Sequence, residues 1–132
     1  ADIETINLEL ILSDMEADMI EFIQKEVTKN ESKPNMIIEN ICRYLEDNLE
    51  FARLIINNNI DPSFPQKILS LDVIKKITLK NHSDIYDMTE MEYLYHFITY
   101  GTYRIIAMWL NKDQRESPDK LSSLILKQTL IK

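Results

Sequence analysis

The scarcity of turn-forming residues limits what this chain can fold into. Its 132 residues include one glycine and four prolines. Tight β-hairpin turns favour glycine because their backbone conformations are ones that other residues rarely adopt. Apolar residues instead recur at spacings of three and four along most of the sequence, which is the period of an amphipathic helix. The sequence therefore predicts an all-α fold in a single domain over residues 1–132, a bundle of about six helices.

Prolines and capping residues mark where these helices are expected to begin. Pro34 suits the first turn of a second helix, and Asn48 follows a break and is expected to cap a short third one. Thr89 and Glu92 have the spacing of a capping box. The expected helices cover about residues 3–27, 34–47, a short stretch through 51–55, 89–110 and 118–131, the last beginning with Ser117 as cap and Pro118 in its first turn. Residues 57–65 are expected to form a loop. Residues 68–77 fit either a helix or a strand.

The net charge of −7 indicates which partners the chain avoids. Nucleic-acid binding relies on lysine and arginine displacing counterions from phosphates, so this chain is not expected to contact DNA or RNA itself. No apolar run approaches the roughly 20 residues of a membrane span, so no membrane partner is expected. A single cysteine is compatible with a reducing compartment, and a cytoplasmic location is the default expectation.

The sequence offers no pattern for enzyme chemistry. One glycine is too few for a phosphate-binding loop or a dinucleotide-binding fingerprint. His82 and His96 lie in no zinc or di-iron motif, and Cys42 lies among isoleucines and leucine with no adjacent base. We therefore expect no catalytic residue, no cofactor and no metal. An enzyme using His96 and nearby tyrosines remains a weaker alternative.

The single glycine, Gly101, lies within the apolar, helix-patterned stretch 95–110. A glycine inside a helix costs about 1 kcal/mol relative to alanine. It could end the helix, reflect neutral drift, or allow another backbone to approach closely, and the large neighbouring residues favour close approach. Two copies of the last two helices could then pair as a four-helix interface around a two-fold axis. The alternative is that the same face packs into the domain's own core.

A resemblance to a known family bears on this choice. The run Phe97, Tyr100, Gly101, Ile105, Ile106, Trp109 and Leu110, followed by Ser117, Pro118 and Leu121, resembles the C-terminal signature of TetR-family transcriptional regulators. The resemblance implies a homodimer formed by the last two helices, and a pocket whose small-molecule ligand changes the spacing of two DNA-binding heads. It implies a regulator, expected to be a repressor, whose DNA contacts are made only through an N-terminal helix-turn-helix domain that residues 1–132 do not contain.

The resemblance and the apolar pattern together give two sets of candidate residues. Arg104 departs from the family, which often has a small residue there, so it is expected to tilt the helix crossing or to form an ion pair across it. The expected dimer interface consists of Phe97, Gly101, Arg104, Ile105, Trp109, Leu121, Leu124 and Ile125. The expected pocket consists of Met19, Phe22, Cys42, Tyr44, Phe51, Phe64, Tyr93 and Tyr100.

Apolar residues of this kind favour a hydrophobic or aromatic effector. Plain core packing is the alternative for each pocket residue taken singly. For the whole chain, the alternative function is a helical protein-interaction module or co-activator without a DNA-binding head, acting by heterodimerisation. A helix-turn-helix domain encoded upstream would favour the regulator, and its absence would favour the module.

Overall fold

The computed structural model describes residues 3–29, 34–58, 62–69 and 87–129. These residues form helices and turns with no strand among them, which confirms the predicted all-α fold. The helices are α1 (Ile3–Lys29), α2 (Pro34–Asp47), α3 (Leu49–Asn58), α4 (Phe64–Ile68), α6 (Met88–Leu110) and α7 (Pro118–Thr129). Residues 70–77 of the helix or strand predicted at 68–77, and the end of the last predicted helix at 130–131, lie outside the described residues.

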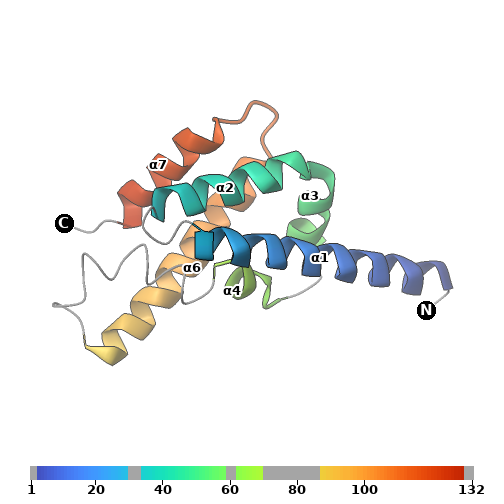
Figure 1. Cartoon of the computed structure of the whole chain (residues 1–132), viewed down its shortest axis with the longest axis horizontal. Coiled ribbons are helices and arrows are strands. Elements are labelled where there is room, and N and C mark those ends of the chain that lie inside the picture. The colour runs from blue at the N-terminus through green and yellow to red at the C-terminus, as the bar shows by residue number, and fades with distance from the viewer. Residues whose placement is uncertain (1–2, 30–33, 59–61, 70–86, 130–132) are drawn as a thin grey trace.

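The helices pack around α2, which contacts α1 and α7 and also touches α3 and α6 (Figure 1). The short helix α4 contacts both α1 and α6. Two parts extend away from this centre in Figure 1: the N-terminal part of α1, and the N-terminal half of α6, drawn in yellow. The packing therefore buries one part of each long helix and leaves another part outside.

The core is a continuous cluster of buried apolar side chains. Trp109 and Phe64 are the two largest fully buried side chains in it, and α2 supplies one complete buried face. The members of the whole core cluster are Leu12, Met19, Ile23, Ile37, Ile38, Ile41, Cys42, Leu45, Phe51, Ala52, Ile55, Phe64, Ile68, Leu69, Ile98, Ile106, Trp109, Leu110, Leu121 and Ile125.

The predicted helix boundaries need two corrections. Asp87, not Thr89, caps α6: its side chain accepts a hydrogen bond from the backbone N–H of Glu90 at 2.8 Å, and Thr89 lies inside the first turn. The predicted loop at 57–65 is also too long, because Asn58 ends α3 and Phe64 already begins α4. Both errors place a boundary within a few residues of its true position.

The predicted break between the second and third helices lies at Asn48. Its polar groups form hydrogen bonds at the end of α2 and at the start of α3. Its backbone carbonyl accepts from the N–H of Ala52 at 2.9 Å and so begins α3. Its side-chain amide donates to the carbonyl of Tyr44 at 2.9 Å, which satisfies a carbonyl at the end of α2. One asparagine therefore separates α2 from α3 without a longer loop.

The C-terminal end of α6 is held by α3. The Arg53 Nε–H donates to the carbonyl of Leu110 at 2.7 Å, one of the last carbonyls of α6, which have no partner within the helix. The side-chain amides of Asn57 and Asn111 bond to each other in both directions, at 2.9 and 3.0 Å. These contacts fix the end of α6 against α3.

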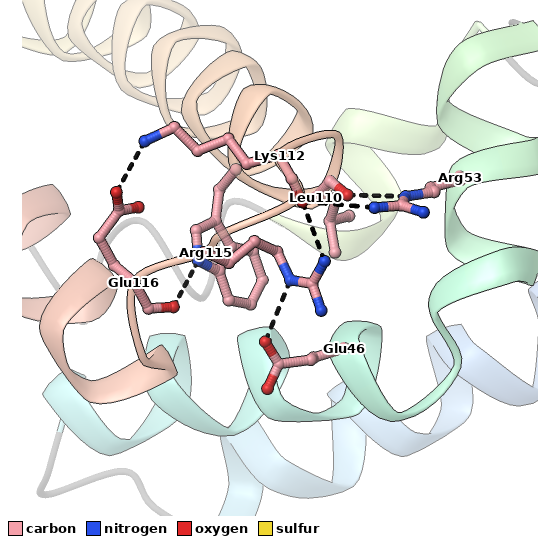
Figure 2. A network of polar contacts seen from close by, with 7 residues as sticks. Glu46, Arg53, Leu110, Lys112, Arg115 and Glu116 are labelled. Atoms are coloured by element: carbon pink, nitrogen blue, oxygen red, sulfur yellow. Dashed lines mark hydrogen bonds and ion pairs between the residues drawn. The ribbon is translucent and has the colours of Figure 1, made fainter.

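The turn from α6 to α7 is cross-linked by polar contacts (Figure 2). The indole N–H of Trp109 donates to the carbonyl of Glu116 at 2.8 Å, and the Glu116 carboxylate pairs with Lys112 at 2.7 Å. The hydrogen bond from Lys112 lowers the pKa of Glu116. Arg115 pairs with Glu46 of α2 at 3.2 Å. Because these contacts tie the turn to α2, they set the rotation of α6 about its own axis.

Cys42 lies inside the core on α2, with no exposed surface. Burial, followed by repulsion from Glu46 and Glu39, raises the pKa of its thiol from an ordinary 9.0 to about 12. The thiol is therefore neutral and inaccessible at neutral pH, so it cannot act as a nucleophile.

We predict that Cys42 destabilises the fold at high pH. Its folded pKa lies above its unfolded pKa, so its contribution to stability is complete below pH 9 and falls as pH rises through about 12. Between pH 8 and pH 10 the unfolding free energy of the wild type should fall by roughly 1 kcal/mol more than that of Cys42→Ala. Urea denaturation at both pH values measures this. Equal losses in the two proteins would contradict the assigned burial.

Candidate functional site

One side of α6 carries large apolar side chains that contact solvent. Tyr93 and Phe97 are 75% and 74% exposed, and Tyr100 and Met108 are also exposed. With Arg104, they lie three, four or seven residues apart, so they form one continuous stripe along the helix. We call Tyr93, Phe97, Tyr100, Arg104 and Met108 the outer α6 face.

The opposite side of α6 is buried in the core. Ile98, Thr102, Ile106 and Trp109 recur at spacings of three and four, and each is buried. α6 is therefore apolar on two sides, whereas a surface helix of a globular domain is normally polar on the side away from the core. Exposed apolar patches of this kind mark interaction sites in soluble proteins.

Gly101 borders the outer α6 face, four residues after Phe97. It is exposed, and a Cβ atom added to it would meet no atom within 4 Å. The packing among the described residues therefore does not require glycine at this position. Its helical setting also excludes the interpretation that it ends a helix, because α6 continues to Leu110.

The structure divides the residues expected at the dimer interface into two groups. Phe97, Gly101, Arg104 and Leu124 are exposed, and Leu124 projects from α7. Trp109, Leu121 and Ile125 are buried in the chain's own core, and Ile105 is half-buried against it. The buried residues hold α6 and α7 in place, so they are not available on the surface. Met108, which was not among the residues expected at the interface, lies on the exposed side of α6. Its spacing of four residues from Arg104 could have indicated this position.

The residues expected to line a pocket are not brought together. Met19, Cys42, Phe51 and Phe64 lie in the core. Tyr93 and Tyr100 lie on the outer α6 face. These six residues therefore do not line a common cavity: four pack in the core and two are exposed to solvent.

The remaining pair, Phe22 and Tyr44, does meet. Their rings stack with centroids 4.2 Å apart, Phe22 projecting from α1 and Tyr44 from α2, and both are half-buried. They line an open groove of about 430 Å³ between the two helices. The other lining residues are Glu26, Lys29, Met36, Asn40, Arg43 and Asp47.

Polar groups in the α1–α2 groove are already partly engaged. The Asn40 side-chain amide donates to the Glu26 carboxylate at 2.7 Å across the groove, and Arg43 pairs with Glu39. The groove thus combines an aromatic wall with charges of both signs. These polar residues were missed by sequence analysis because residues on two different helices share no sequence spacing.

The described part of the chain shows no group of three or more histidine, cysteine, aspartate or glutamate side chains placed to hold a metal ion. Among the same residues, no helix combines the length and the apolar character that crossing a membrane requires.

The comparisons with known proteins place the chain in a family. A family model described as a transcriptional regulator C-terminal region, from the TetR group, matches residues 32–130. No curated protein and no solved structure matches the chain. The match covers α2 to α7, which include both the outer α6 face and the turn that fixes it. The chain therefore belongs to the TetR-family transcriptional regulators, as their C-terminal region.

Proposed function

We propose that this domain binds an effector and forms the homodimer of a TetR-like transcriptional repressor. The observation that carries the proposal is the outer α6 face, an apolar stripe on a helix whose opposite side is already buried. A second copy, pairing α6 with α6 and adding Leu124 of α7, would cover this stripe around a two-fold axis.

The energy available from such pairing is considerable. Burying an aromatic or methionine side chain contributes about 1.5–3 kcal/mol relative to leaving it in water. Tyr93, Phe97 and Met108 each expose more than half of their surface, and a two-fold interface buries every residue twice. This gain must exceed the cost of association, which is several kcal/mol.

Gly101 supports the close approach of two helices. Without a side chain at this point, a partner backbone can come nearer to α6, and the contact returns what the helix loses in propensity. Arg104 lies three residues further along the outer α6 face, where its charge would sit at the rim or pair with an acid of the second copy. The crossing is therefore proposed to centre near Gly101.

The effector is proposed to bind at the α1–α2 groove. Phe22 and Tyr44 offer a stacking surface, and the charges of Lys29 and Arg43 lie around it. Small-molecule sites combine an apolar wall with few polar groups in this way. A ligand that spreads or closes α1 against α2 would shift the population of helix arrangements, and so regulate the protein. DNA contact is proposed to reside in another part of the protein, because this chain is acidic.

We predict that the chain is a dimer and that Phe97→Gln weakens it. Losing the phenyl ring twice should raise the dissociation constant at least tenfold. Leu54→Gln, on α3, removes an exposed apolar side chain outside the outer α6 face and should leave the constant unchanged. Light scattering at tens of micromolar, followed by sedimentation equilibrium, gives both values. A monomeric wild type would refute homodimerisation and favour the heterodimerising module.

We also predict that a small aromatic probe binds the α1–α2 groove. Titration of indole into the ¹⁵N-labelled chain should shift the amide signals of Phe22, Met36 and Tyr44. Tyr44→Ala should abolish these shifts because it removes the stacking ring, whereas Tyr93→Ala, a tyrosine on the outer α6 face, should retain them. Shifts confined to the outer α6 face would argue against this effector site.

A further inference from the structure

The residues of the outer α6 face are spaced alike in both directions from the point between Tyr100 and Gly101. Phe97 lies three residues before Tyr100, and Arg104 lies three residues after Gly101. The two outermost members of the face lie seven residues before Tyr100 and seven after Gly101. If two copies of α6 lie antiparallel around a two-fold axis at this point, each residue therefore meets the residue at the same distance on the other side.

The outer α6 face runs nearly straight along the helix. About four turns of an α-helix separate Tyr93 from Met108, so the stripe ends close to the side on which it begins. A stripe of this direction lets two helices lie along each other at a shallow angle. The opposite side of α6 is closed to such pairing, because Ile98, Ile106 and Trp109 are buried in the core.

The two residues that lie three positions from the central pair are complementary in their electrostatics. The face of an aromatic ring attracts a cation, and arginine is the cation that most often packs on it. Phe97 is 74% exposed, and Arg104 is exposed on the same side of the helix. In the antiparallel pair each Phe97 ring meets Arg104 of the second copy, and the two arginines stay about 10 Å apart along the helix axes.

The other two pairs are complementary in size and shape. Tyr100 meets Gly101 of the second copy, where backbone without a side chain gives the ring a surface to pack on. A Cβ atom added to Gly101 would meet no atom within 4 Å, so this space is open to a partner. Tyr93 meets Met108 of the second copy, and a thioether packs favourably against an aromatic ring. No two large side chains therefore oppose each other at the centre.

We propose that two copies of this chain pair in an antiparallel register centred between Tyr100 and Gly101, in which Arg104 of each copy packs on the Phe97 ring of the other. This inference rests on the homodimer proposed above and specifies its geometry. The second copy is the occupant because the outer α6 face is complementary to itself in charge and in size. The helical period explains the even spacing, but the matching of a cation to a ring and of a ring to a glycine belongs to this sequence.

The spacing alone also allows a second register. Centring the pair on Phe97 would place Arg104 opposite Glu90 of the second copy, which is exposed too. This register would bring two phenyl rings together at the point of closest approach and would place Gly101 about one turn away from it. Met108 would then lie beyond the outer α6 face of the second copy. The position of the glycine therefore favours the first register.

Exchanging charges between two chains tests the register. In Phe97→Lys the introduced lysine faces Arg104 of the second copy, so the dissociation constant of this homodimer should rise at least tenfold. In Arg104→Glu the introduced carboxylate faces a phenyl ring, and the constant should rise at least threefold. A mixture of the two variants should form a heterodimer at least tenfold tighter than the Phe97→Lys homodimer, because the lysine and the glutamate then face each other.

Fluorescence-detected sedimentation of the 132-residue chain measures this, with N-terminally labelled Phe97→Lys titrated by unlabelled Arg104→Glu. Tyr93→Glu is the matched control. It places the same charge on the outer α6 face but opposite Met108 of the second copy, so it should not restore association with Phe97→Lys. The replaced side chains are exposed, so the helical content measured by circular dichroism should equal that of the wild type.

Two outcomes would contradict the register while leaving the dimer intact. If the wild type is a dimer but Arg104→Glu associates with Phe97→Lys no more tightly than Tyr93→Glu does, the two positions do not face each other. If Arg104→Glu instead associates tightly with Glu90→Lys, the pair is centred on Phe97. A monomeric wild type would refute the proposed homodimer itself, so failure of the register and failure of the dimer are distinguishable.

Discussion

The rotation of α6 about its own axis determines which of its apolar side chains enter the core and which stay exposed. Trp109 is buried and its indole N–H bonds to Glu116, while Arg53 holds the carbonyl of Leu110. These contacts at the C-terminal end of α6 decide which side of the helix enters the core. They thereby decide that Phe97 faces outward, and the described residues leave the apolar stripe on α6 uncovered.

The sequence was sufficient for the fold but not for this rotation. Turn-poor composition and helical spacing predicted the all-α bundle, and the Ser117–Pro118 pair predicted the start of α7 correctly. The spacing could not separate Phe97 from Trp109, because α6 is apolar around more than half of its circumference and a period of 3.6 then fits several directions. The direction is set by contacts with α2 and α3, which are distant in sequence.

The residues of the candidate pocket were even harder to predict from the sequence than the rotation of α6. Aromatic and sulfur-containing residues were grouped by type, and residue type does not distinguish a core position from a groove wall. Phe22 and Tyr44 meet because α1 and α2 pack side by side, whereas Met19 and Cys42, on the same two helices, point into the core. Only the packing of the two helices separates these positions.

The short helix α4 contacts two helices that carry proposed sites. These are α1, which lines the proposed effector groove, and α6, which carries the outer α6 face. Phe64 meets the ring of Tyr103 on α6 edge to face at 6.2 Å, and Lys67 pairs with Glu16 on α1. Burial, followed by repulsion from Glu16 on α1, raises the pKa of Tyr103 to about 12. α4 therefore lies between α1 and α6 and contacts both helices.

Cross-linking at Gly101 tests directly whether two copies of this chain pair through the outer α6 face. A disulfide requires two Cα atoms within about 7 Å, a separation that only close helix pairing provides. In a Cys42→Ala background, Gly101→Cys should oxidise to a covalent dimer, whereas Asp113→Cys, in the exposed α6–α7 turn, should remain monomeric on a non-reducing gel. Failure of Gly101→Cys to cross-link in a chain that is otherwise dimeric would show that the copies meet through another surface.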